Sequence, residues 1–144
     1  MIAIDTNILV YAHRRDSPWF ELARKALRSL AEGTAAWAIA WPCLHEFLAI
    51  STHPNIYKPP TELTRALEQV AALLASPSLV ALNEAAGYWP VLRRLLAAGR
   101  VTGPQVHDAR IAALCIFHGV SELWSADRDF TRFPELKTRN PLVS

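Results

Sequence analysis

Acidic residues interrupt apolar stretches at four places in this chain of 144 residues: Asp5, Glu46, Asp108 and Asp127. Carboxylates that share one cleft repel one another, because two unit charges about 4 Å apart cost about 4 kcal/mol at an effective dielectric near 20. Such a group must take up protons, with raised pKa values, or bind a cation. Oxygen ligands without clustered cysteine or histidine favour hard ions such as Mg²⁺ or Mn²⁺. These ions usually meet a phosphate substrate, so the four acids indicate metal-dependent phosphodiester hydrolysis.

Two of these acids have ordinary structural alternatives near the start of the chain. Asp5 follows a short apolar run, where it could simply cap the next helix, since Asp, Asn and Thr are all favoured there. Glu46 could lie on the exposed face of an amphipathic helix, although apolar residues surround it. If Asp5 serves a shared site instead, Asn7 becomes the better candidate for the helix cap.

The other two acids also have alternatives. Asp108 could complement the positive end of its helix dipole, with Arg110 or His107 as its partner. Asp127 could be a turn residue. For each acid considered alone, the structural role explains its position at least as well as a functional role does. The occurrence of all four acids is better explained by one shared site.

The elements that would position these acids follow from hydrophobic patterning. Short apolar runs predict buried strands at residues 1–4, 35–39, 79–82 and 123–125, and residues 136–139 could add an edge strand. Apolar residues at helical spacing, with their capping signals, predict helices that begin at Ile8, Ser17, Trp41, Leu63, Asn83 and Thr102. Pro90 predicts a kink in the fifth of these helices, or a single turn before the helix proper.

Strands that alternate with helices are typical of βαβ units, with a parallel sheet covered on both faces. We therefore predict one α/β domain over residues 1–144, with three α/β/α layers and a central parallel sheet of four to five strands. In such sheets ligands bind just outside the carboxyl ends of the strands. The following helices start there too, so all four acids can reach one cleft.

Composition narrows the class of protein. Hydrophobic residues make up 51% of the chain and charged residues 19%, which argues against disorder. No apolar run is long enough to span a bilayer, so we expect a soluble, cytoplasmic protein without a membrane partner. Cys43 and Cys115 lie in apolar helical patterns without metal spacing, and both are expected to be reduced core residues. A net charge of +2 neither proves nor excludes nucleic-acid binding.

Some basic and aromatic side chains could serve a nucleic acid. Four arginines adjoin the predicted site and could hold RNA phosphates, with a solvated surface as the equal alternative: Arg14, Arg15, Arg128 and Arg132. Three tryptophans lie in apolar patterns and are assigned to the core or an interface: Trp37, Trp41 and Trp89. Trp19 is the tryptophan expected to be exposed. His45 and His107 are given structural or rim roles, and the proline-rich loop 52–60 could border the substrate path or a dimer interface.

The acidic segments also resemble a known family. They are Asp5-Thr6-Asn7 after an apolar start, Glu46 within residues 44–47, Asp108 within residues 106–109, and the run from Ser125 to Phe130. Their order and spacing resemble the PIN-domain ribonucleases, and most of all the VapC-type toxins of bacterial toxin–antitoxin pairs. The resemblance extends over nearly the whole chain, including residues 139–142.

The resemblance implies a PIN fold and a Mg²⁺- or Mn²⁺-dependent endoribonuclease that leaves a 5′-phosphate and a 3′-hydroxyl. It also implies a homodimer and a cognate VapB-type antitoxin, and it allows a higher toxin–antitoxin assembly. The catalytic and metal-binding acids would be Asp5, Glu46, Asp108 and Asp127. Supporting roles would fall to Thr6, Asn7, Ser125 and Asp129. Serine at position 125, where the family often has threonine, keeps the hydroxyl.

Other classes of protein fit less well. Haloacid-dehalogenase-like phosphatases, which use an aspartate as a covalent nucleophile, carry a second aspartate two residues later, where this chain has Asn7. Receiver domains need an acidic pair after the first strand and an aspartate after the third, where this chain has Leu82-Asn83. A non-catalytic binding module, whose acids receive an arginine from a partner, is the remaining alternative.

Overall fold

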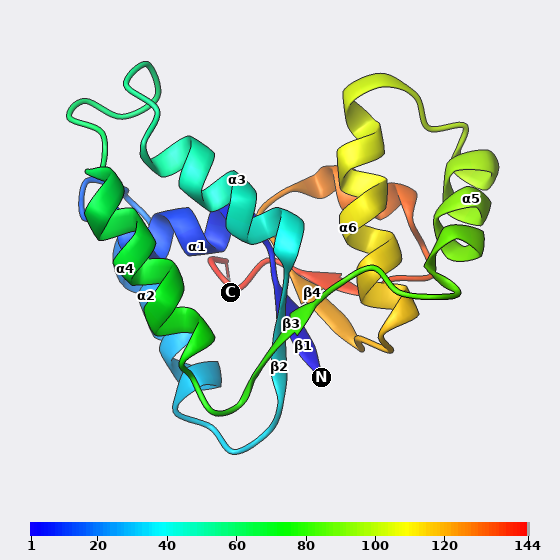
Figure 1. The fold of residues 1–144 in the computed structure, drawn as a ribbon, viewed down its shortest axis with the longest axis horizontal. Coiled ribbons are helices and arrows are strands. Elements are labelled where there is room, and N and C mark those ends of the chain that lie inside the picture. Colours follow the sequence, from blue (N-terminus) through cyan, green and yellow to red (C-terminus); the bar gives the residue numbers. More distant parts are fainter. Residues whose placement is uncertain (144) are drawn as a thin grey trace.

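The computed structural model describes residues 1–143, which contain a five-stranded parallel sheet (Figure 1). The strands are β1 (Ile2–Ile4), β2 (Trp37–Ala40), β3 (Leu79–Leu82), β4 (Glu122–Trp124) and β5 (Thr138–Arg139). Their order is β3-β2-β1-β4-β5, and every pairing is parallel. The predicted parallel sheet is therefore confirmed, and residues 138–139 form its edge strand.

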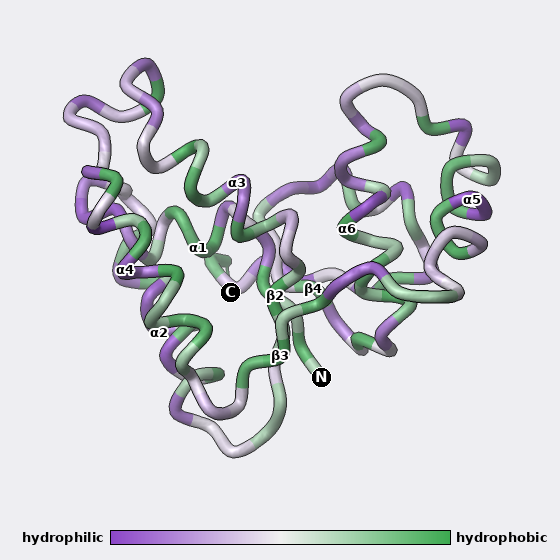
Figure 2. Tube along the Cα trace, viewed as in Figure 1, coloured by the Kyte–Doolittle hydropathy of each residue, from purple (hydrophilic) through white to green (hydrophobic). Residues whose placement is uncertain are grey.

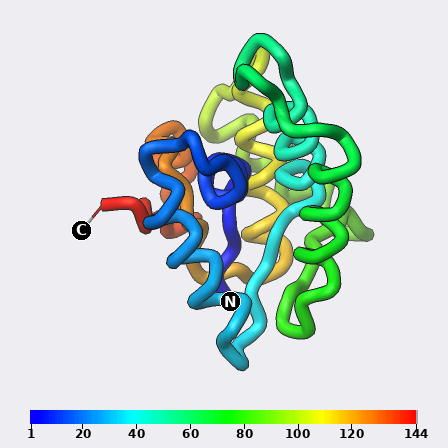
Figure 3. Tube along the Cα trace, turned by 90° about the vertical axis from the view of Figure 1, so that its left-hand side faces the viewer, coloured from blue at the N-terminus to red at the C-terminus, as the bar shows by residue number. Residues whose placement is uncertain are grey.

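Helices cover both faces of this sheet, which confirms the predicted three-layer α/β/α fold. The α-helices are α1 (Thr6–His13), α2 (Phe20–Ala31), α3 (Trp41–Ser51), α4 (Leu63–Leu74), α5 (Tyr88–Gly99) and α6 (Val106–Phe117), and the 3₁₀ helices are η1 (Gly103–Gln105) and η2 (Arg128–Arg132). In Figure 1, α1, α2 and α4 lie to one side of the sheet and α5 and α6 to the other. Figure 3 shows the loop between α3 and α4 at one extremity of the molecule.

The central strands β1 and β2 are apolar along their length, as expected where both faces of a sheet are covered. All four residues of β2 are buried, and Trp37 and Ile39 are fully inaccessible. Figure 2 shows mainly hydrophobic residues along β2 and alternating polar and apolar residues along α2 and α4. No helix within residues 1–143 is long and apolar enough to cross a membrane.

Two helix starts differ from the prediction. Ser17 does not begin α2, which starts at Phe20; its hydroxyl instead accepts a hydrogen bond from the N–H of Trp19, 3.1 Å away, and so closes the preceding turn. Asn83 does not cap α5, because Gly87, with φ of 94°, precedes that helix. Pro90 is only the third residue of α5, where no N–H is needed for an intrahelical bond, so it is accommodated in the first turn.

Candidate active site

The site is built around the end of β1. The N–H of Asp5 donates to the carbonyl of Trp124 in β4 at 3.0 Å, so Asp5 still belongs to the central pairing of the sheet. Its side chain accepts a 2.8 Å hydrogen bond from the N–H of Thr6 and thereby caps α1. The prediction that Asn7 provides this cap is wrong, because Asn7 lies inside the helix and only Asp5 has the extended backbone of a cap residue.

Both carboxylate oxygens of Asp5 are occupied by donors. Oδ1 accepts from the N–H of Thr6 and faces the thiol of Cys43 at 3.6 Å. Oδ2 accepts from the hydroxyl of Ser125 at 2.7 Å and from the amide of Asn7 at 3.4 Å. These donors come from α1, α3 and the residue after β4, so three elements fix one carboxylate. The contact with Cys43 was not foreseen; its position three residues before Glu46 was the available signal.

The carboxyl group of Asp5 also has an unusual pKa. Only 5% of it is exposed, and burial raises the pKa of its carboxyl to about 6. The negative charge of Glu46 raises this pKa further, while the hydrogen bonds from Ser125 and Thr6 act in the opposite direction. A cation near this buried carboxylate would stabilise its charged form.

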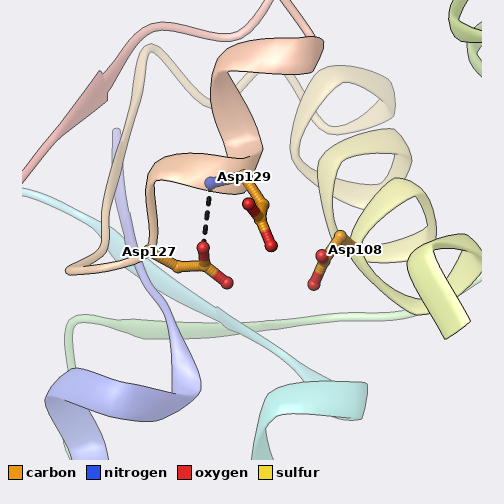
Figure 4. Close-up of side chains that lie close together, drawn as sticks. All are labelled: Asp108, Asp127 and Asp129. Carbon is orange, nitrogen blue, oxygen red and sulfur yellow. Dashed lines mark hydrogen bonds between the residues drawn. The ribbon is translucent and has the colours of Figure 1, made fainter.

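The carboxylate cluster, defined as Asp108, Asp127 and Asp129, lies beside Asp5. One carboxylate oxygen from each residue lies within 4.8 Å of the other two, and Figure 4 shows the three side chains converging from α6 and η2. Asp127 caps η2, since its Oδ1 accepts from the N–H of Asp129 at 2.8 Å. Asp129, which was predicted to have a supporting role, is thus placed with Asp108 and Asp127.

The charges of this cluster act on one another. Partial burial is the main cause of the raised pKa of Asp108, and Asp127, Asp129 and Glu46 add to it. The positive charge of Arg132 lowers this pKa.

Asp108 lies in the first turn of α6, as its structural alternative required, but Arg110 is not its partner. Arg110 lies 3.6 Å from Glu84 instead, and the side chain of His107 is exposed. Arg132 is held on the cluster side of η2 by a hydrogen bond that it donates to Gln105.

Glu46 joins Asp5 to the carboxylate cluster. Its Oε2 accepts a 2.9 Å hydrogen bond from the hydroxyl of Thr6. Its negative charge contributes to the raised pKa of both Asp5 and Asp108. Asp5 and Glu46 lie outside the group of converging oxygens found among residues 1–143, so the four predicted acids form two adjacent sets rather than one.

Asn7 and Ser125 tie these sets together. The amide of Asn7 donates to the Ser125 hydroxyl at 3.2 Å, and its Oδ1 accepts from the N–H of Ala126 at 3.2 Å. The Ser125 hydroxyl also accepts from the N–H of Asp127 at 3.0 Å. The segment that carries Asp127 is therefore fixed to the first helix.

Arg14 is engaged away from the site. Its guanidinium binds both carboxylate oxygens of Asp16, at 2.7 and 3.0 Å, and the carbonyl of Pro59 at 2.9 Å. It also lies 4.3 Å from the ring centre of Tyr57, and only 12% of its side chain is exposed. Arg14 thus anchors the loop between α3 and α4. Arg15 and Arg128 are exposed.

The remaining sequence predictions have mixed outcomes. Cys43 and Cys115 are buried free thiols, as predicted. Trp37 is buried and Trp19 is 43% exposed, also as predicted. Trp89 is 61% exposed and so is not a core residue, whereas Tyr88 and Leu95 of the same helix are buried.

The cluster suits a small divalent cation. Ligands about 2.1 Å from a Mg²⁺ ion can be at most about 4.2 Å apart, so oxygens within 4.8 Å need only a small side-chain adjustment to share one. All donors are carboxylate oxygens, the ligand type that Mg²⁺ and Mn²⁺ prefer. The residues present therefore fit the ion that the acids predicted.

Comparison with known proteins agrees with this geometry. The PIN domain model matches residues 2–136. Ribonuclease VapC48 of Mycobacterium tuberculosis is 32% identical over 137 residues, covering 95% of this chain and 94% of the relative. Ribonuclease VapC43 of the same organism is 33% identical over 142 residues, covering 99% and 96%.

Solved structures share the fold. VapBC2 from Rickettsia felis, bound to a DNA fragment from its promoter, matches with a TM-score of 0.67 and 23% identity, over 97% of this chain and 98% of that one. VapC20 of Mycobacterium tuberculosis, described as a Sarcin-Ricin loop cleaving toxin, matches with a TM-score of 0.68 and 14% identity, over 91% and 93%.

Proposed function

Because the chain belongs to the PIN-domain family, we propose that it is a Mg²⁺- or Mn²⁺-dependent endoribonuclease and the toxin of a toxin–antitoxin pair. The observation that carries this proposal is the convergence of Asp108, Asp127 and Asp129 within 4.8 Å, beside the buried Asp5. The full-length relatives named as VapC ribonucleases support the same activity.

Each acid has a distinct role in this proposal. Asp108, Asp127 and Asp129 hold the ion, which when bound activates water and offsets the charge on the attacking and leaving oxygens. Glu46 and Asp5 lie outside these converging oxygens and would add negative charge beside the ion. Thr6, Asn7 and Ser125 orient these two acids through the hydrogen bonds described above. Water attacks phosphorus and the bond to the 3′ oxygen breaks, leaving a 5′-phosphate and a 3′-hydroxyl.

The substrate phosphates need positive charge outside the acidic centre. Arg128 and Arg132 lie on η2, beside the cluster, and both are exposed. Contacts between arginine and phosphate position a nucleic acid without reading its sequence. Arg15 is farther along the surface and would serve flanking phosphates, while Arg14 is committed to Asp16 and the α3–α4 loop.

A covalent mechanism on Asp5 is disfavoured. A nucleophilic carboxylate must present a free oxygen to phosphorus, whereas both oxygens of Asp5 accept hydrogen bonds and the residue is 5% exposed. A non-catalytic module with an acidic cleft is the other alternative, and cleavage assays separate it from a nuclease.

The partners of this chain follow from its family. We propose a VapB-type antitoxin, a homodimer that can enter a larger toxin–antitoxin assembly, and RNA as substrate in the cytoplasm. The structural similarity to VapBC2 supports such an antitoxin for this chain. We further propose that residues 1–144 form one PIN domain.

The decisive assay is RNA cleavage by the purified protein. End-labelled RNA is incubated with Mn²⁺ or with EDTA, using wild type, Asp108→Asn and the control Glu68→Gln, an exposed residue of α4. We expect Mn²⁺-dependent cleavage by wild type and Glu68→Gln and a loss of at least about 100-fold for Asp108→Asn. Circular dichroism checks that the variants are folded. Equal cleavage by Asp108→Asn and wild type would reject the assignment.

A further inference from the structure

A cavity lies at the carboxyl ends of β2 and β3 and is lined in part by α6, the helix that also carries Asp108. Its volume is about 210 Å³, and three segments line it: the first turn of α3, the residues after β3, and α6. We call it the base pocket, defined by Trp41, His45, Asn83, Glu84 and Arg110. None of these residues belongs to the carboxylate cluster, and the proposed hydrolysis does not use them.

The base pocket and the cluster share two helices. His45 directly precedes Glu46 on α3, and Arg110 follows Asp108 by two residues on α6. Neighbouring residues of a helix point about 100° apart, so Glu46 faces Asp5 and Asp108 while His45 lines the cavity. A strand with one phosphate at the cluster can therefore place a neighbouring base in the pocket.

One wall of the pocket is aromatic. The rings of Trp41 and His45 have centres 5.9 Å apart with a 39° angle between their planes. His45 is exposed and Trp41 is half-buried, so both present ring surface outside the core. Single-stranded RNA is typically recognised by stacking of unstacked bases on such side chains.

The other wall offers a donor and an acceptor that are not satisfied by each other. Nε of Arg110 lies 3.6 Å from Oε1 of Glu84, which is too far for a hydrogen bond. This Nε is buried and has no hydrogen-bond partner among residues 1–143. The side chains of Arg110 and Glu84 are 37% and 56% exposed, so both remain within reach of a ligand in the cavity that they line. The loop that carries Glu84 is fixed by a 2.7 Å hydrogen bond from the ring of His118 to the carbonyl of Asn83.

This combination matches one base best. Guanine offers the O6 and N7 acceptors that arginine binds as a pair, and its N1–H and N2–H₂ groups offer two donors to a carboxylate. We propose that the base pocket binds a guanine of the RNA next to the scissile phosphate, stacked against Trp41 and His45, with Arg110 on its acceptors and Glu84 on its donors. The proposal deepens the ribonuclease function and rests on it for the encounter with RNA.

Binding without cleavage tests the pocket independently of activity. Guanosine 5′-monophosphate is titrated in EDTA while the indole N–H signals of the protein are followed by NMR, with Trp41→Leu identifying the Trp41 signal. We expect guanosine monophosphate to shift that signal at concentrations at least about tenfold below those needed for the other three monophosphates. Glu84→Gln should abolish the preference, and Glu68→Gln should keep it. Equal shifts with all four nucleotides, or none at Trp41, would overturn the proposal.

Cleavage of a random-sequence RNA pool with Mn²⁺ is the second test of the base pocket. Sequencing of the cut ends should show guanine enriched at one fixed position near the cleavage site, and Glu84→Gln should reduce this enrichment about tenfold. Cleavage with no guanine preference, or with a preference that Glu84→Gln leaves intact, rejects the base pocket while the nuclease stands. No cleavage by wild type rejects the nuclease, and the nucleotide titration then decides the pocket by itself.

Discussion

The hydroxyl of Ser125 donates a 2.7 Å hydrogen bond to Oδ2 of Asp5 and joins residues at the ends of β1 and β4. The same hydroxyl accepts from the N–H of Asp127, so it connects the buried acid to the segment that carries the cluster. One small side chain therefore sets the protonation of Asp5 and the position of Asp127 together.

Substitution of Ser125 tests this link. Ser125→Ala removes the hydrogen bond that holds the pKa of Asp5 down, so that pKa should rise above about 6. The acid limb of the pH–activity profile should move to higher pH, and the free energy of unfolding should fall by about 1–3 kcal/mol. Ser125→Thr, which keeps the hydroxyl, should restore both, and Ser29→Ala on the exposed face of α2 is the control. An unmoved profile in Ser125→Ala would contradict the link.

Burial of Asp5 predicts that the metal-free protein loses stability as pH rises. The folded pKa of about 6 exceeds the ordinary value of 3.8, so the folded state binds this proton more tightly than the unfolded chain. The resulting stabilisation is complete below pH 3.8 and is lost as pH rises through about 6. A shift of about two pKa units corresponds to about 3 kcal/mol.

Urea unfolding in EDTA between pH 4 and pH 7.5 measures this loss. Asp5→Asn cannot titrate, so the difference between wild type and Asp5→Asn isolates Asp5 from the other acids. Wild type should lose stability relative to this variant as pH rises. Parallel curves would show that Asp5 titrates normally.

Asp129 should bind the ion directly. Its carboxylate lies with those of Asp108 and Asp127, so Asp129→Asn should weaken Mn²⁺ binding at least about tenfold, as Asp108→Asn should. Titration calorimetry with Mn²⁺ measures both, with Glu68→Gln as the unchanged control. Wild-type affinity in Asp129→Asn would restrict that residue to a supporting role.

Arg14 should matter for stability rather than for RNA. Arg14→Ala removes two bonds to Asp16, one to Pro59 and the stacking on Tyr57, which should lower the free energy of unfolding by about 2 kcal/mol. The exposed Arg15 is the matched control, and Arg15→Ala should change stability by less than about 0.5 kcal/mol. Weaker RNA binding by Arg14→Ala at unchanged stability would restore Arg14 as a phosphate ligand.

Patterning in the sequence was sufficient for the fold because β1, β2 and β3 are apolar runs and the helices have regular spacing. Helix starts were less predictable, as at Ser17 and Asn83, since several residues there can satisfy free N–H groups. Trp89 shows another limit: an apolar pattern does not reveal which face of a helix meets the sheet.

Within the site, the residue types predicted which side chains lie in the same region but not which of them contact one another. Asp5 is both helix cap and buried acid, although these roles were treated as alternatives. The place of Asp129 in the cluster depends on the 3₁₀ turn that Asp127 caps, and the contact of Cys43 with Asp5 depends on how α3 leaves β2. Such details arise from tertiary packing, which a local pattern does not encode.

The position of β1 between β2 and β4 has a consequence for synthesis on the ribosome. β1 and β2 leave the ribosome early and can pair with each other. The other edge of β1 stays unpaired until β4 has been synthesised. Ser125, Asp127 and Asp129 follow β4, so a nascent chain lacks most of the cluster until its last part has emerged. A nascent chain that ends before β4 therefore lacks Asp127 and Asp129, as well as the Ser125 hydroxyl that binds Asp5.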